Sequence, residues 1–76
     1  MFHATIVTSK RVIYTGEAWS VFLPGSTGEF EILELHKTIL SLLKKGRIII
    51  NWDRTIPITK GVVRMQKDEL VAVVEE

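Results

Sequence analysis

The residues of this chain that could carry acid–base or metal chemistry are few and widely spaced. His3 and His36 are the two histidines, there is no cysteine, and the carboxylates are scattered along 76 residues. Glu34 and His36 could share one face of a strand, but no HExxH motif or paired-ligand spacing accompanies them. The sequence therefore predicts no catalytic residue, no metal ligand and no cofactor.

A glycine-flanked loop, Gly25-Ser26-Thr27-Gly28, is the other stretch that could bind or react with a ligand. It is not the G-x-S-x-G elbow of a hydrolase, and no Gly-Lys-Ser/Thr follows it as in a phosphate-binding loop. The simplest interpretation is a turn that the glycines permit.

Length and charge narrow the classes of protein further. A chain of 76 residues is one small domain, and the absence of cysteine rules out disulfide or thiolate–zinc support. Ten Lys and Arg against nine Asp and Glu give a net charge of +1, so nucleic-acid binding is not favoured. It remains the alternative function, as a small β-barrel with a basic surface and an aromatic stacking platform. The residues concerned would be Lys44, Lys45, Arg47, Arg54, Lys60 and Trp52.

The elements that would position these residues are mostly short strands. Residues 2–7 alternate between apolar and polar side chains, as a half-buried strand does. Further runs rich in β-branched and aromatic residues end at turn-like breaks and predict strands at 12–14, 18–23, 47–52, 55–59, 61–66 and 70–74. Short strands at this spacing predict an all-β fold, a small antiparallel two-sheet β-sandwich or flattened barrel.

Residues 29–45 fit two interpretations. Ser26 and Glu29 have the spacing of a helical capping box, and an apolar stripe through Phe30, Leu33, Leu40 and Leu43 follows at near-helical steps. The same residues also fit two strands separated by an irregular corner. Local sequence does not decide between them.

A resemblance to a known family favours the strands. Leu-Pro-Gly-Ser-Thr-Gly-Glu-Phe at 23–30, then His36 and Lys-Lys-Gly-Arg-Ile at 44–48, resembles the amino-terminal β-sandwich of the epsilon subunit of F-type ATP synthases. Residues 6–8, 12–17, 61–66 and 70–73 resemble that domain's opening hairpin and closing strands. The likeness covers nearly the whole chain and implies one domain, residues 1–76, with a turn at 24–29 and strands on either side of a corner at His36.

The resemblance also implies a function. The family's domain is a non-catalytic part of the central stalk, which links the gamma subunit to the ring of c subunits and couples ion flow to ATP synthesis. The residues that match the family's c-ring contact are Ser26, Thr27, Gly28 and Glu29, and those that match its gamma contact are Thr8, His36 and Ser41. Trp19 and Trp52 are expected in the core or at its rim, with one of them as a further candidate for the gamma interface.

Two departures from the family pattern limit this carry-over. The family has glycines and prolines where this chain has Glu31, Glu34-Leu35 and Lys37-Thr38, so the likeness does not fix the geometry of residues 31–38. We also expect the domain without the helical hairpin that commonly follows it. With no targeting segment or membrane span predicted, the expected location is peripheral, on the cytoplasmic face of the bacterial inner membrane or the thylakoid equivalent.

Overall fold

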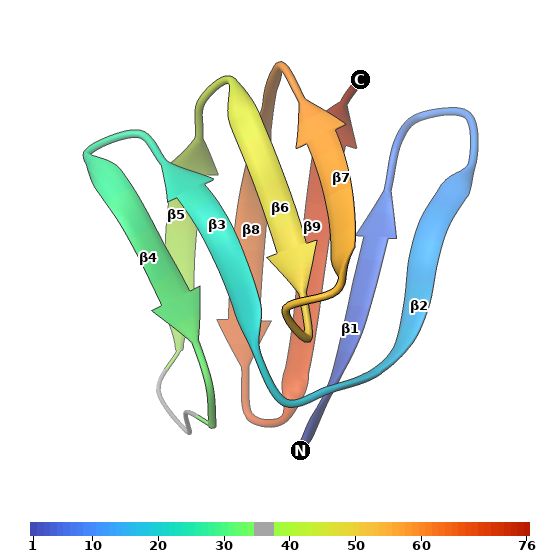
Figure 1. Cartoon of the computed structure of the whole chain (residues 1–76), viewed down its shortest axis with the longest axis vertical. Helices are drawn as coiled ribbons and strands as arrows, with labels where there is room; N and C mark the ends of the chain where they lie inside the picture. Colours follow the sequence, from blue (N-terminus) through green and yellow to red (C-terminus); the bar gives the residue numbers. More distant parts are fainter. Residues whose placement is uncertain (35–37) are drawn as a thin grey trace.

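The computed structural model describes residues 1–34 and 38–76, and these residues form nine strands and no helix (Figure 1). The strands are β1 (Phe2–Val7), β2 (Val12–Ala18), β3 (Val21–Gly25), β4 (Gly28–Ile32), β5 (Ile39–Leu43), β6 (Gly46–Ile50), β7 (Arg54–Ile58), β8 (Lys60–Gln66) and β9 (Glu69–Glu75). The all-β prediction is confirmed. No helix among the described residues offers a stretch able to span a bilayer.

The strands form one hydrogen-bonded sheet in the order β2-β1-β9-β8-β5-β3-β6-β7, with β4 added to the other edge of β3. The sheet folds over where β5 meets β3, a contact of a single residue pair, Leu43 with Gly25. Strands β4, β3, β6 and β7 then cover one side of the core, and β5, β8, β9, β1 and β2 cover the other (Figure 1). This is the predicted sandwich, with one difference from a purely antiparallel arrangement: β1 and β9 run parallel.

The core fills the space between the two layers. Side chains that alternate along the strands point inward, because successive residues of a strand face opposite sides. The buried apolar residues are Phe2, Ala4, Ile6, Ala18, Val21, Leu23, Ile32, Leu43, Ile48, Ile50, Ile56, Ile58, Val63, Met65, Leu70, Ala72 and Val74. Ser20 is a polar residue buried with them, and its hydroxyl donates a 2.5 Å hydrogen bond to Glu31 Oε2.

The segment that fitted both a helix and strands is β-structure wherever it is described. β4 pairs with β3 over five residues, and β5 pairs with β8 from Ile39 opposite Met65 to Leu43 opposite Gly61. These ladders satisfy backbone groups that a helix would have satisfied internally. The helical interpretation is wrong for residues 29–34 and 38–45; His36 lies outside the described residues.

Loops gather at the two ends of the sandwich. One end, called here the tip end, holds residues 8–11, 26–27, 44–45, 59 and 76. The opposite end, called the far end, holds residues 1, 19–20, 33–34, 51–53 and 67–68. In Figure 1 the tip end is uppermost and the far end lowest.

Candidate functional site

The residues predicted to meet the c ring lie together on the β3–β4 hairpin at the tip end. Pro24 and Gly25 end β3, Ser26 and Thr27 form the exposed turn, and Gly28 opens β4 opposite Gly25. Gly28 has a φ of 149°, a backbone conformation that side chains other than glycine rarely adopt. Glu29 follows it and is exposed. The turn thus presents two hydroxyl groups and one carboxylate at the tip.

A second turn, which the sequence did not assign to the site, packs beside this hairpin. The backbone N–H of Ser26 donates to the carbonyl of Leu42 at 2.9 Å, and the N–H of Lys44 donates to the carbonyl of Pro24 at 2.9 Å. The exposed Lys44 and Lys45 therefore lie next to the Ser26–Thr27 turn, although they are almost 20 residues away in sequence. The tip combines hydroxyl, carboxylate and ammonium groups, and can form hydrogen bonds and ion pairs with a polar partner surface.

Of the three residues predicted to contact gamma, Thr8 and Ser41 are described and lie on different parts of the sandwich, whereas His36 is outside the described residues. Thr8 lies at the tip end, where its hydroxyl oxygen accepts hydrogen bonds from the N–H groups of Lys10 (3.1 Å) and Arg11 (3.2 Å) and so stabilises the β1–β2 loop. Ser41 lies opposite the buried Val63, so it shares the core-facing side of β5. Its hydroxyl donates to the carbonyl of Leu42 at 3.3 Å.

A row of apolar side chains crosses the outer face of five neighbouring strands, and it was not predicted from the sequence. The pairings place Leu42 opposite Val62, Val62 opposite Val73, Val73 beside Val7, and Val7 opposite Val12. Leu42 is 65% exposed, Val73 47% and Val12 56%. Leu40, 73% exposed, extends the row along β5. We call this set the outer apolar row; soluble proteins commonly cover such a patch with a partner.

The outer apolar row and the tip meet in a groove. The groove has a volume of 820 Å³, and its lining includes Thr8, Ser26, Leu42, Lys60 and Val73. Thr8, which was predicted to contact gamma, therefore lines the same groove as Ser26, which was predicted to contact the c ring. Leu42 belongs to both surfaces, since its side chain lies in the row and its carbonyl holds Ser26. The two candidate surfaces are therefore continuous.

Titratable side chains do not gather into a reactive site in the part of the chain that is described. No group of three or more His, Asp or Glu residues there could hold a metal ion. Glu34, half of the Glu34–His36 pair considered for catalysis, receives a hydrogen bond from the amino group of Met1 and raises the pKa of that amino group. His3 lies within 3.5 Å of the hydroxyls of Thr5 and Thr15, on an exposed sheet surface.

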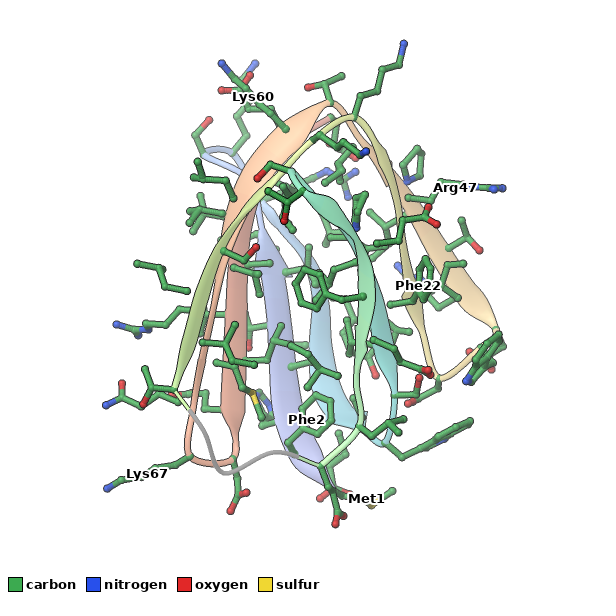
Figure 2. All side chains as sticks on the ribbon, turned by 90° about the vertical axis from the view of Figure 1, so that its left-hand side faces the viewer. Met1, Phe2, Phe22, Arg47, Lys60 and Lys67 are labelled. Carbon is green, nitrogen blue, oxygen red and sulfur yellow. The ribbon has the colours of Figure 1, made fainter. Side chains whose placement is uncertain are left out.

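The basic residues considered for nucleic-acid binding are divided between the two ends. Lys44, Lys45, Arg47 and Lys60 lie toward the tip end, whereas Arg54 and Trp52 belong to the far end. Figure 2 shows Lys60 and Arg47 well away from Met1 and Lys67, which mark the far end. A stacking platform and a basic groove must follow the same nucleic-acid strand, and the structure does not bring these residues together. The nucleic-acid alternative gains nothing from the geometry.

Neither tryptophan is buried in the core; of the two places expected for them, the core and its rim, only the rim fits their exposure. Trp19 is 48% exposed in the β2–β3 connection, and Trp52 is 63% exposed in the β6–β7 turn. The sequence could not distinguish them from core residues, because both adjoin strongly apolar runs.

Comparisons with a family model and with curated proteins agree on one family. The family model described as "ATP synthase, Delta/Epsilon chain, beta-sandwich domain" matches residues 1–76. Similar curated proteins are ATP synthase epsilon chains from Vesicomyosocius okutanii (38% identity over 69 residues, 87% of this chain and 50% of that protein) and Campylobacter jejuni (44% over 69 residues, 86% and 54%). That of Aquifex aeolicus is 35% identical over 78 residues, covering 100% of this chain and 59% of that protein.

Solved structures share the fold at low sequence identity. A chain in the central stalk and c-ring structure of the Tetrahymena thermophila mitochondrial ATP synthase superimposes with a TM-score of 0.83 at 13% identity, covering 99% of this chain and 63% of that one. A chain of the Euglena gracilis mitochondrial ATP synthase superimposes with a TM-score of 0.85 at 14% identity, covering 99% of this chain and 51% of that one. The chain spans about half the length of the curated relatives it matches first.

Proposed function

The chain belongs to the ATP synthase delta/epsilon family through its β-sandwich domain, and from this premise we propose that it is a central-stalk domain that joins the gamma subunit to the c ring. In this role residues 1–76 act as one domain that transmits rotation and performs no catalysis itself. Ion flow turns the ring, the domain holds the ring to the base of gamma, and gamma then drives the catalytic head. The domain is peripheral to the membrane, on the cytoplasmic face in a bacterium or the equivalent face in a plastid.

The observation that carries the proposal is the junction of two different surfaces at Leu42. An adaptor between two proteins needs two interfaces in fixed relative orientation, and here the polar tip and the outer apolar row share a residue. We assign the tip, with Ser26, Thr27, Gly28 and Glu29, to the polar loops of the ring. The outer apolar row, flanked by Thr8, is assigned to gamma. His36 and Ser41 remain proposed gamma contacts on family likeness alone.

The chemistry of each surface suits its assigned partner. A permanent contact with gamma is stabilised by burying apolar surface, which contributes about 25 cal/mol of free energy per Å² removed from water. Contact with a polar ring surface is better served by charges, which fix register more than they add affinity. A close-packed sandwich core transmits strain with little compliance, as torque transfer requires.

Co-elution with the gamma subunit of the same source tests the gamma assignment. In size-exclusion chromatography at moderate salt we expect a one-to-one complex. We expect Leu42→Ser and Val73→Ser each to weaken it by about tenfold, as loss of a central interface contact of about 1–2 kcal/mol implies. Lys67→Gln, at the far end, is the matched control and should have no effect. Separate elution of two folded proteins, or equal effects of all three substitutions, would refute the assignment.

A further inference from the structure

The far end carries a second apolar surface that the proposed function does not use. Among the residues of this end that the structure describes, four large apolar side chains are exposed: Met1, Leu33, Trp19 and Trp52. They come from four different segments of the chain, and the two tryptophans are the only ones in the sequence. We call these four residues the far-end patch.

Short-range contacts connect the members of the far-end patch into one surface. The amino group of Met1 contacts the carboxylate of Glu34, next to Leu33. Leu33 follows Ile32, which pairs with Val21, so it lies beside the connection that holds Trp19. The N–H of Trp19 donates a 2.8 Å hydrogen bond to Asn51 Oδ1, adjacent to Trp52. Each member is therefore within two residues of a direct contact to the next.

The backbone at Trp52 is strained in a way that packing does not explain. Asn51 and Trp52 have φ values of 53° and 61°, and the N–H of Asp53 donates to the carbonyl of Ile50 at 3.1 Å. This is a tight hairpin turn with two left-handed residues, for which Asn-Gly is the favoured pair. A bulky aromatic residue in this conformation costs roughly 1 kcal/mol or more. The chain has tryptophan where glycine would be preferred, and leaves its indole in solvent.

Carboxylates surround the far-end patch. Glu17, Glu34 and Asp68 lie close enough to the amino group of Met1 to act on it electrostatically, and Asp53 is adjacent to Trp52. Glu69 begins β9 at the same end. Among the described residues of this end, the cationic groups are Arg54, Lys67 and the amino group of Met1, which is paired with Glu34, so the five carboxylates outnumber them. The patch is thus apolar in its centre and acidic at its rim.

We propose that the far-end patch is a docking site for an amphipathic protein helix whose apolar residues are flanked by lysine or arginine. The two tryptophans supply the large apolar anchors that dominate binding energy at interfaces, and helices of this kind dock on apolar surfaces through such anchors. The acidic rim selects basic flanks and repels nucleic acid and anionic lipid. A second copy of the chain would bring two acidic rims together. This site lies at the opposite end from the tip, and it does not depend on the assignments to gamma and the c ring.

Intrinsic fluorescence tests the site directly, because both tryptophans lie in it. The probe is a helical peptide of about 18 residues made of leucine and lysine, long enough to hold a helix when bound. The comparison peptide has glutamate in place of every lysine. We expect the lysine peptide to shift tryptophan emission to shorter wavelength and to bind more weakly as salt rises. The glutamate peptide should bind at least tenfold more weakly.

Three variants locate the binding. Trp52→Gly should keep the domain folded, since glycine relieves the strained turn. It should weaken binding of the lysine peptide by about 30-fold, because an interface anchor is lost. Asp53→Asn combined with Glu17→Gln should weaken binding of the lysine peptide several-fold and make that binding less dependent on salt. Leu40→Ala, on the outer face, is the control and should leave binding unchanged.

Other outcomes would overturn the proposal. Equal binding of both peptides would show that the acidic rim selects nothing. A larger emission shift with phosphatidylglycerol vesicles than with the lysine peptide would make the patch a membrane anchor. Self-association that Trp52→Gly abolishes, without peptide binding, would assign the patch to a second copy. Equal loss on Leu40→Ala and Trp52→Gly would place peptide binding elsewhere on the domain.

Discussion

The guanidinium of Arg54 lies over the ring of Tyr14, 5.7 Å from its centroid, and its Nη2 donates a 3.2 Å hydrogen bond to the carbonyl of Ile13. Arg54 begins β7 and Tyr14 belongs to β2, which are the two ends of the strand order. One side chain therefore connects edges of the curled sheet that share no backbone ladder. Such a contact also occupies an edge carbonyl of β2, which would otherwise be open to pairing with another strand.

Removing the Arg54 side chain should destabilise the contact between β2 and β7. We expect Arg54→Ala to lower the free energy of unfolding by about 1–2 kcal/mol, the sum of an exposed cation–π contact and one charge-assisted hydrogen bond. Urea denaturation measures the change. Arg47→Ala is the matched control, because Arg47 is an exposed arginine with no such contact among the described residues, and it should alter stability by less than about 0.5 kcal/mol. Equal losses for the two variants would contradict a bridging role.

Ser20 and Glu31 form the hydrogen bond on which the start of β3 depends. Ser20 is 1% exposed, and Glu31 is half-buried opposite Phe22. Ser20→Ala leaves the carboxylate without this donor and should cost about 1–3 kcal/mol. In a double-mutant cycle with Glu31→Gln, the two effects should fall short of additivity, because both remove the same bond. Additive effects, measured by chemical denaturation, would show that the pair is not coupled.

Gly25 is required by close approach within the β3–β4 hairpin. A Cβ atom there would lie 2.5 Å from the carbonyl oxygen of Gly28 and 2.7 Å from the Phe30 ring. Gly25→Ala should therefore displace the hairpin and destabilise the domain by about 1–3 kcal/mol. Gly16→Ala is the control, since its nearest neighbour is the Tyr14 hydroxyl at 3.2 Å, the end of a side chain that can move. A thermal melt that shows no difference between the two variants would contradict this account.

Much of the fold could be predicted from the sequence, because most strands carry their own signal. Residues 2–7 alternate between apolar and polar side chains and residues 61–66 include β-branched ones, and both predictions agree with β1 and β8 within one residue. Residues 18–23 were displaced from the observed β3, Val21–Gly25, because Pro24 and Gly25 read locally as a turn. Pro24 and Gly25 end a strand because they pair with Glu29 and Gly28, and local sequence patterns do not predict this pairing.

The candidate surfaces were harder to predict because they are assembled across strands. The Ser26–Thr27 turn could be singled out from its glycines, whereas its neighbour Lys44 is placed there by a hydrogen bond to Pro24 that depends on the whole topology. The outer apolar row requires the register of four strand pairs. Nothing in the local sequence distinguishes Leu42, which faces out, from Leu43, which faces in.

The tip should bind the c ring through charge, independently of gamma. We expect Glu29→Gln, and Lys44→Gln combined with Lys45→Gln, each to weaken binding of the domain to isolated, detergent-solubilised c rings by about five- to tenfold, roughly 1 kcal/mol of lost ion pairing. The affinity of the unmodified domain should fall as salt rises, and less steeply in each variant. Neither variant should alter co-elution with gamma, because both leave the outer apolar row intact. Lys67→Gln, at the far end, controls for net charge. If ring binding were unchanged in both tip variants, or lost equally in Lys67→Gln, the ring contact would lie elsewhere on the sandwich.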